Sequence, residues 1–339
     1  MRIRHLTIAI VVLTLSALAS ATQLRQIAII DIPGHPGFDG IAFAGGYLVM
    51  THSGAGTVDV FSVPQRRLMT QIRGMKGPSG VAGDEAAAKV YVANSDGGNI
   101  AVISTRTWQV LETIPVPGSP DSLVLAPEAQ RLYAADAEDQ TIAVVDLAHG
   151  NRVQSAAVGG TPEYMAYDPL RKLLFASLQD LREIVALDPA LKVVSRYPLA
   201  ASQPTGLALD AKARRLYVAV RYAVIALDAD TGAESSRVAT PAGVDMLWYD
   251  GSSGTLYAAA NGSVTVIRAG SGKLENVGEF NTEVRGHVLA FDPANGLVYM
   301  PGGREGRSKL LILKRVQAPH PQNAEQVAEQ GAATSRPPQ

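Results

Sequence analysis

Apolar and polar residues alternate along most of the chain in short runs that end at Gly, Pro, Asn or Asp. The run "YVANSDGGNIAVIS" (91–104) consists of two alternating segments around a polar turn, and "YAADAEDQTIAVVD" (133–146) repeats this scheme 42 residues later. Alternation with a period of two is typical of β-strands, and the intervening residues are those that favour tight turns. The pattern therefore predicts β-hairpins built from a repeated unit.

The unit occurs seven times. Its first strand begins at Asp39, Ser79, Asp121, Glu163, Thr205, Asp245 and His287, so the period is 40 or 42 residues. A period of this length with four strand signals in each unit is typical of a β-propeller, whereas helical repeats would show a spacing of 3.6 residues. One such unit has two apolar faces, and stacking the units around an axis buries both.

The two ends of the repeat array predict how the ring closes. The last unit has three strand signals, and the run "LRQIAIID" (24–31) precedes the first complete unit without belonging to it. If this N-terminal strand completes the last blade, no blade keeps an open edge. We therefore predict an all-β fold, a seven-bladed β-propeller with four antiparallel strands per blade, closed by the N-terminal strand.

The segment 90–154 resembles the YVTN-type β-propeller repeat family. It contains the Tyr-Val-x-Asn strand (91–94), a third strand that is similar to Val-Ile-Asp, and the Ile-Pro-Val step (114–116) into the next blade. The segments "FASLQD" and "YVAVRY" of later blades depart from the Asn. The resemblance implies the propeller fold, in a family whose members bind proteins, nucleic acid or small molecules and in which some relatives are lactonases.

Composition narrows the classes of partner and chemistry. Thirty Lys and Arg residues against 31 Asp and Glu give a formal charge of −1, so no overall field attracts nucleic acid or anionic lipid. We expect no nucleic acid partner. The absence of Cys excludes disulfides, thiolate metal sites and thiol catalysis. The chain also lacks a P-loop, a dinucleotide fingerprint and a Gly-x-Ser-x-Gly elbow.

The two ends of the chain differ from the repeats. Residues 1–21 have Arg2 and Arg4 before an apolar run and small residues behind it, which is the layout of a secretory signal peptide. An uncleaved anchor is the alternative. Cleavage would leave a propeller at 22–316 without a membrane span, in the periplasm or outside the cell. Residues 317–339 are rich in Pro, Gln and Ala and predict a disordered tail.

One face of the ring is predicted to hold the site, because the start of the first strand and the end of the second lie at the same end of each blade. At the start of the first strand we expect a ligand to meet Asp39, Asp121, Glu163, Asp245 and His287. The second strands end at polar residues in three blades, His52, Asn94 and Asp136. His35 and His52 lie in Gly-rich loops and either reach this face or are exposed to solvent. The alternative is a water-filled channel that carries no ligand.

Carboxylates, an imidazole and an amide around one opening could hold a divalent cation, with Ca²⁺, Zn²⁺ and Mn²⁺ as the candidates. The blade number and the acidic mouth also resemble the gluconolactonase and calcium-binding lactonase propellers. By blade position, this resemblance implies Glu163, Asn94, Asp136 and Asp245 as metal ligands. No local catalytic motif of those enzymes can be matched to this chain.

Two functions follow from these observations. The first is an exported binding or scaffold protein that presents the channel mouth to a protein partner or a small-molecule ligand. The alternative is a metal-dependent lactonase or related hydrolase that uses the carboxylates of the mouth. Whether the protein is an enzyme stays open at the level of sequence.

Overall fold

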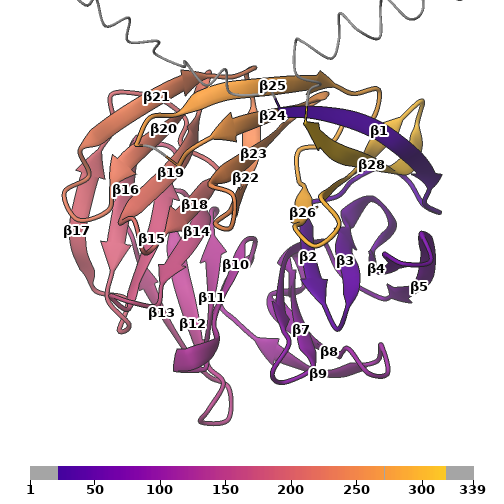
Figure 1. Ribbon diagram of the computed structural model, residues 1–339. Helices are drawn as coiled ribbons and strands as arrows, with labels where there is room; N and C mark the ends of the chain where they lie inside the picture. The colour runs from indigo at the N-terminus through magenta and orange to yellow at the C-terminus, as the bar shows by residue number, and fades with distance from the viewer. Residues whose placement is uncertain (1–21, 271, 318–339) are drawn as a thin grey trace, which may run out of the picture.

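The computed structural model describes residues 22–270 and 272–317, which form seven four-stranded antiparallel sheets around a central axis (Figure 1). The predicted all-β, seven-bladed propeller is confirmed. In each blade the first strand lies nearest the axis and the fourth lies at the periphery. The predicted signal peptide and all but the first residue of the predicted tail lie outside the described residues, while Gln317 ends the last strand.

Six blades are contiguous in sequence. Blade 1 consists of β2 (Gly40–Ala44), β3 (Tyr47–His52), β4 (Thr57–Ser62) and β5 (Arg67–Arg73). Blade 2 consists of β6 (Pro78–Asp84), β7 (Lys89–Asn94), β8 (Asn99–Ser104) and β9 (Val110–Pro115). Blade 3 consists of β10 (Leu123–Ala126), β11 (Arg131–Asp136), β12 (Thr141–Asp146) and β13 (Arg152–Ala157). Blade 4 consists of β14 (Pro162–Asp168), β15 (Leu173–Leu178), β16 (Glu183–Leu187) and β17 (Val193–Pro198). Blade 5 consists of β18 (Leu207–Asp210), β19 (Arg215–Val220), β20 (Ala223–Asp228) and β21 (Glu234–Ala239). Blade 6 consists of β22 (Val244–Asp250), β23 (Thr255–Ala260), β24 (Ser263–Arg268) and β25 (Glu275–Asn281). Single turns of 3₁₀ helix lie at η1 (Ser53–Ala55), η2 (Ser95–Gly97) and η3 (Pro127–Ala129).

Blade 7 joins the first strand of the described residues to the last three, as predicted. It consists of β26 (Ala290–Asp292), β27 (Leu297–Arg304), β28 (Arg307–Gln317) and, as its outer strand, β1 (Thr22–Asp31). The pairing of β1 with β28 is antiparallel and runs from Thr22 opposite Gln317 to Asp31 opposite Lys309. The blade that begins and ends the chain is therefore a complete sheet, and its third strand is not left as an edge.

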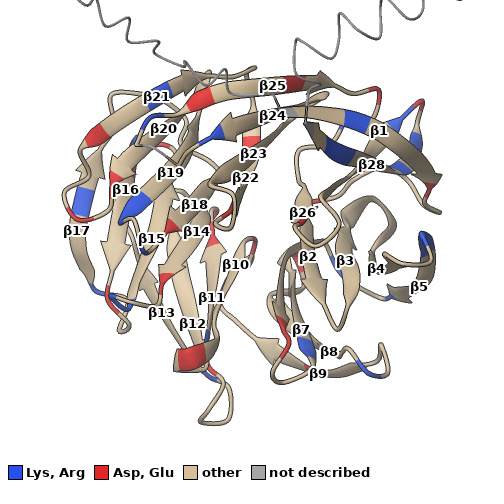
Figure 2. Cartoon of the chain, viewed as in Figure 1, with Lys and Arg blue, Asp and Glu red and all other residues tan. Residues whose placement is uncertain are grey.

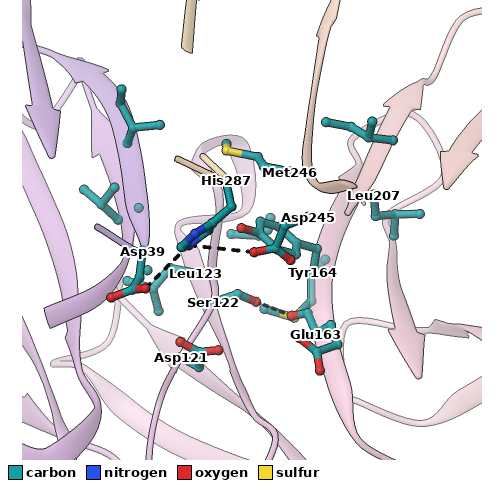
Figure 3. Close-up of a pocket in the computed structure, with 17 residues that line it drawn as sticks. Asp39, Asp121, Ser122, Leu123, Glu163, Tyr164, Leu207, Asp245, Met246 and His287 are labelled. Carbon is teal, nitrogen blue, oxygen red and sulfur yellow. Dashed lines mark hydrogen bonds and ion pairs between the residues drawn. The ribbon is translucent and has the colours of Figure 1, made fainter. Parts of the chain in front are cut away.

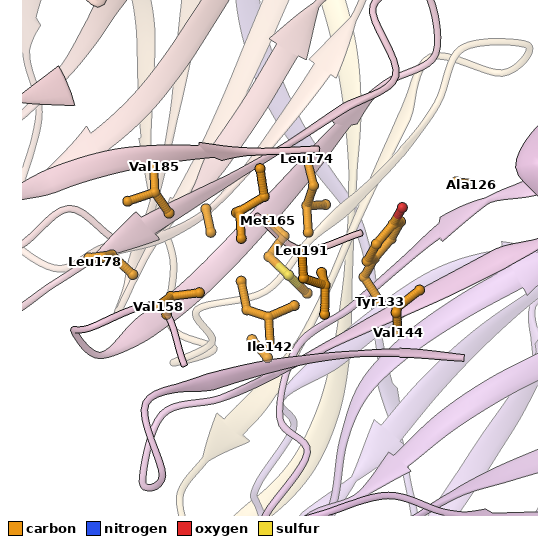
Figure 4. Close-up of a cluster of buried hydrophobic side chains, with 13 residues drawn as sticks. Ala126, Tyr133, Ile142, Val144, Val158, Met165, Leu174, Leu178, Val185 and Leu191 are labelled. Atoms are coloured by element: carbon orange, nitrogen blue, oxygen red, sulfur yellow. The ribbon is translucent and has the colours of Figure 1, made fainter. Parts of the chain in front are cut away.

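The core consists of seven apolar layers between consecutive blades. Between blades 3 and 4, Tyr133 and Ile142 face Leu174 and Val185 across the layer (Figure 4). The second and third strands are almost fully buried because neighbouring blades cover both of their faces, whereas the fourth strands consist almost entirely of exposed and half-buried residues. This gradient explains why the two central strands of each unit have the most continuous apolar sequence.

A large aromatic residue occupies the third position of the second strand in blades 2 to 7. The series is Tyr91, Tyr133, Phe175, Tyr217, Tyr257 and Tyr299, all with an exposed fraction of 2% or less. Because these rings bury a large apolar area at the same register in each blade, they set the spacing between blades.

Close approach of the first strands builds the inner wall of the ring. A Cβ atom on Gly80 would collide with the carbonyl oxygen of Asp121, and one on Gly206 with that of Asp245. The amide of Gly80 donates a hydrogen bond to the same Asp121 carbonyl, at 2.6 Å. Glycine at these positions therefore lets consecutive blades touch through their backbones, which places the residues that begin the first strands around a narrow opening.

Charged residues of both signs occur on the outer strands, for example along β1 and β21 (Figure 2). This distribution agrees with the formal charge of −1 for the whole chain. Across residues 22–270 and 272–317, none of the helical segments has the length and apolar character required to cross a bilayer.

Candidate functional site

A cavity of about 250 Å³ opens at the axis, where the first strands begin. Four carboxyl groups and one imidazole line it, namely those of Asp39, Asp121, Glu163, Asp245 and His287 (Figure 3). They come from blades 1, 3, 4, 6 and 7, and each lies in the first strand or in the connection just before it. The structure thus brings all five residues of the predicted ligand-binding set to one cavity, although they are up to 248 residues apart in sequence.

Blades 2 and 5 contribute differently to this face. The residues at the matching positions, Ser79 and Thr205, do not line the cavity. Thr205 donates its hydroxyl to the carbonyl of Val244 at 2.8 Å, and Ser79 donates to the carbonyl of Asp121 at 3.1 Å. Their side chains therefore join neighbouring blades instead of facing the opening.

His287 lies between two carboxylates. Its Nε2 atom is 3.6 Å from Oδ1 of Asp39 and 3.8 Å from Oδ2 of Asp245. The hydrogen bond to Asp39 raises the pKa of His287 above its ordinary value against the opposing effect of burial, and the charge of Asp245 adds to the increase. Burial by itself would raise the pKa of Asp39, but hydrogen bonds from His287 and Ser53 outweigh it and lower this pKa. The Asp39 and His287 pair is therefore stabilised in its charged form.

The remaining acids are held closer to neutrality. Burial raises the pKa of Glu163 to about 7, and the charges of Asp245 and Asp121 add to the shift. The Asp121 side chain is exposed at the opening, yet desolvation by the surrounding wall raises its pKa, and the charge of Asp39 adds to this. Burial also raises the pKa of Asp245 despite the nearby His287. The shared cause is that several like charges are confined in one poorly solvated space.

Apolar side chains form the rest of the wall. They include Leu123, Met165, Leu207 and Met246, which lie in the first strands of blades 3 to 6. None of the residues that line the cavity is a Lys or an Arg. The site therefore combines an apolar wall with a rim in which four carboxylates face one imidazole, an arrangement that suits a ligand with one charged end and one apolar end.

The expected metal ligands do not converge. Glu163 and Asp245 line the cavity, whereas Asn94 and Asp136 do not. Across the described part of the chain, no group of three or more His, Asp and Glu side chains has an arrangement that could hold a metal ion. The residues implied by the lactonase resemblance thus do not fit a metal site as a set. Binding of a divalent cation itself stays a prediction.

Asn94 and Asp136, at the ends of two second strands, form hydrogen bonds with neighbouring residues instead. Asp136 accepts hydrogen bonds from the amides of Ser119 at 2.8 Å and Asp139 at 3.0 Å. Asn94 donates from its side-chain amide to Asn99 at 2.9 Å. Both residues are buried, because the last residue of the second strand borders a tight hairpin whose polar groups need partners.

His52 also differs from its sequence-based interpretation. It neither faces the channel nor lies at the surface, since its exposed fraction is 0%. Its Nδ1 atom pairs with Oδ2 of Asp59 at 2.8 Å, and its Nε2 atom lies 3.1 Å from the hydroxyl of Ser308. Sequence reasoning missed this cluster. The only local signal is the spacing of His52 and Asp59 across one hairpin, and Ser308 lies 256 residues away.

The pKa of Glu163 predicts a pH dependence of stability. Its folded value of about 7 lies above the ordinary value of 4.5. The group therefore contributes stability that is fully present below pH 4.5 and is lost as the pH rises through about 7. Compared with wild type, Glu163→Gln should gain free energy of unfolding across this interval. Urea melts at several pH values measure the difference, and Glu85→Gln at an exposed turn is the control. A difference that does not change with pH would contradict the assignment.

Comparison with known proteins supports the fold. No family model and no curated protein sequence matches the chain. Among solved structures, a chain of hydrazine synthase from Kuenenia stuttgartiensis is similar, with a TM-score of 0.72, 14% identity, and coverage of 85% of this chain and 97% of that one. A chain of a mitotic checkpoint complex has a TM-score of 0.73 and 12% identity, with coverage of 86% of this chain and 95% of that one. The β-propeller domain of Cps50 (Swd1) from Myceliophteria thermophila has a TM-score of 0.71 and 14% identity, with coverage of 86% of this chain and 99% of that one.

These likenesses and the observed blades define the class of protein as a seven-bladed β-propeller. At 12–14% identity they show the fold alone. Membership of the YVTN-type repeat family stays a prediction that rests on the sequence motifs of blades 2 and 3.

Proposed function

We propose that this protein is an exported binding protein whose channel mouth receives a positively charged group. The observation that carries the proposal is the cavity of about 250 Å³ with four carboxylates, one imidazole and no Lys or Arg in its lining. Even with His287 protonated and Glu163 neutral, the three aspartates outnumber the positive charges. A cation is therefore favoured at this mouth, and the low-dielectric walls strengthen the attraction.

The apolar wall adds a second requirement to the ligand. Side chains such as Leu123, Met165 and Leu207 offer apolar contact in the same cavity as the acidic groups. A ligand gains most when an apolar body follows its charged head into the cavity. Small organic ammonium ions have this chemistry, and so do the Lys and Arg side chains of a protein partner.

A protein partner and export are each supported by a separate observation. One structurally similar chain comes from a multiprotein complex, the mitotic checkpoint complex, so this fold can take part in protein assembly. The basic and apolar layout of residues 1–21 supports export to the periplasm or the outside of the cell. We derive no hydrolytic step, because Asn94 and Asp136 lie away from the cavity that holds Glu163 and Asp245.

Calorimetric titration with matched probes tests this function. Benzylammonium should bind at least about tenfold more tightly than benzyl alcohol, which has a similar shape and no charge, because a charge contact in a poorly solvated site is worth about 1.4 kcal/mol or more. An Arg-containing peptide and its citrulline counterpart form the second arm and separate a protein side chain from a small molecule. Ca²⁺, Mn²⁺ and Zn²⁺ form a third arm.

Variants locate the binding. Asp245→Asn should weaken cation binding about tenfold or more, because it removes a rim carboxylate without changing its shape. Asp96→Asn is the matched control, since Asp96 is an exposed acid in η2, next to the end of the second strand of blade 2, and does not line the cavity. Equal affinity for the charged and neutral probes, or equal weakening by both variants, would refute the function.

A further inference from the structure

Three consecutive carbonyl groups in the connection from β1 to β2 are held by side chains. This connection, residues 32–39, is called the closing loop below, because it links the strand that closes the ring to blade 1. The carbonyls of residues 33–35 each accept one hydrogen bond. The side-chain amide of Gln71 donates to the carbonyl of residue 33 at 2.9 Å. The hydroxyl of Ser308 donates to that of residue 34 at 3.0 Å, and Nε2 of His52 donates to that of residue 35 at 2.7 Å. The donors come from three strands of two blades, β5, β28 and β3.

Asp59 lies at the centre of this buried cluster. One of its oxygens accepts hydrogen bonds from Thr57 at 2.6 Å and Gln71 at 3.0 Å, and the other is 2.8 Å from Nδ1 of His52. Both His52 and Asp59 have an exposed fraction of 0%. Buried polar groups of this kind persist in a fold when every donor and acceptor is paired, and these are.

The hydrogen bonds determine where the protons are. A carbonyl oxygen can only accept, so Nε2 of His52 carries a hydrogen that it donates to the carbonyl of His35. A second proton must lie between Nδ1 and Oδ2 of Asp59, because two lone pairs at 2.8 Å would repel each other. The imidazole and the carboxyl group thus share two protons and are neutral as a pair.

This proton arrangement excludes a hydrolase triad, although Ser308, His52 and Asp59 have its composition. The hydroxyl of Ser308 donates to the carbonyl of Gly34, and Nε2 of His52 already carries a hydrogen and cannot act as a base. The closing loop also covers the cluster, since the ring of Phe38 stacks on His52 with centroids 4.0 Å apart. The role of the cluster therefore follows from the closing loop, whose carbonyls it binds.

The closing loop packs so closely against the cluster that two of its residues have no space for a Cβ atom. Gly34 has φ +122° and Gly37 has φ +148°, a backbone region that favours glycine. A Cβ atom on Gly34 would meet the His52 ring at 2.8 Å, and one on Gly37 would meet the amide of Gly54 at 2.7 Å. The loop therefore has a single tightly packed arrangement on blade 1, and it ends at Asp39.

We propose that His52, Asp59 and Ser308 are positioning residues for the channel mouth. Ser308 and His52 hold the carbonyls of residues 34 and 35, and Asp59 orients His52, so together they fix the closing loop and place the Asp39 carboxylate at 3.6 Å from His287. The inference concerns the cavity of the proposed function, but the loop is held in the protein alone, without any ligand. The buried polar cluster at the ring closure thus determines the geometry of the site.

Hydrogen exchange measured by mass spectrometry on the full chain tests this. In Ser308→Ala, amides of the closing loop, including that of Asp39, should exchange about tenfold faster, because the carbonyl of Gly34 loses its hydrogen-bond donor. Ser177→Ala is the matched control. Ser177 is equally buried and donates to the carbonyl of Thr205 at 2.6 Å in another blade, so its loss should leave the closing loop unchanged.

Asp59→Asn tests the proton arrangement with little change of shape. An amide at this position keeps its oxygen with the Thr57 and Gln71 donors and gives an N–H to Nδ1 of His52, which leaves the hydrogen on Nε2 in place, so the closing loop should exchange as it does in wild type. The inference is overturned if the loop in Ser308→Ala exchanges as it does in Ser177→Ala, and the proton arrangement is refuted if Asp59→Asn loosens the loop. If the loop loosens while wild type prefers benzylammonium no more than benzyl alcohol, the proposed function fails and the positioning role stands.

Discussion

Deleting residues 22–31 is expected to abolish cooperative folding. The deletion removes β1, whose pairs with β28 run from Thr22 to Asp31, and it uncovers apolar side chains of blade 7. Each lost backbone hydrogen bond costs about 1 kcal/mol, and a ladder of this length approaches the total stability of about 5–15 kcal/mol of a typical protein. Circular dichroism melts and size-exclusion chromatography should show loss of the sharp transition and association through the open edge of β28.

A synthetic peptide with the sequence of residues 22–31 provides the control. Added in trans, it should restore the transition, because the rest of blade 7 is complete and only its outer strand is missing. A peptide of the same composition with the alternation scrambled should not restore it, since its apolar residues would not fall on the buried face. A shortened chain that melts at the same temperature as the full chain would show that β1 does not close the ring.

Tyr299→Ala should cause the largest loss of stability among single substitutions in the aromatic series. Tyr299 is 1% exposed, and its ring lies 6.2 Å from that of Phe43 and 6.5 Å from that of Phe61. Both partners belong to blade 1, so the substitution opens a cavity where the ring closes. Replacement of a buried aromatic residue by Ala costs about 3–5 kcal/mol in free energy of unfolding, measurable by urea titration.

The same substitution at an exposed site separates burial from residue type. Tyr222 is 59% exposed at the β19–β20 turn, where Arg221 lies 5.4 Å from its ring. Tyr222→Ala should change the free energy of unfolding by about 0.5 kcal/mol or less, apart from the loss of this weak contact. Similar losses in the two variants would mean that Tyr299 does not serve as a packing residue between blades 7 and 1.

Sequence reasoning placed five residues correctly because it relied on register within a strand. Asp39, Asp121, Glu163, Asp245 and His287 occupy the same position of the repeat, so the symmetry of the ring brings them to one opening. Knowing the period and the blade number was enough for this step. Whether a cation or another ligand binds there is a question for the titrations.

The same reasoning did not place the ends of the second strands. Asn94 and Asp136 lie at the predicted end of their blades, but the amide nitrogen of Asn94 and the carboxylate of Asp136 are hydrogen-bonded to neighbouring residues and neither side chain lines the cavity. Strand register indicates where along a blade a residue lies. It does not indicate whether a side chain faces the axis or a hairpin, because this depends on which backbone groups nearby lack partners.

The sequence by itself determined the seven blades, their four strands and the closure by the N-terminal strand, because alternation and turn residues are local and recur in every unit. The tertiary structure decided which polar residues form the mouth and which are buried. His52 is the example, since its partners include a serine 256 residues away that the closure of the ring brings beside it. Such contacts depend on how blade 7 packs against blade 1, and a local sequence pattern does not encode contacts between residues so far apart in the chain.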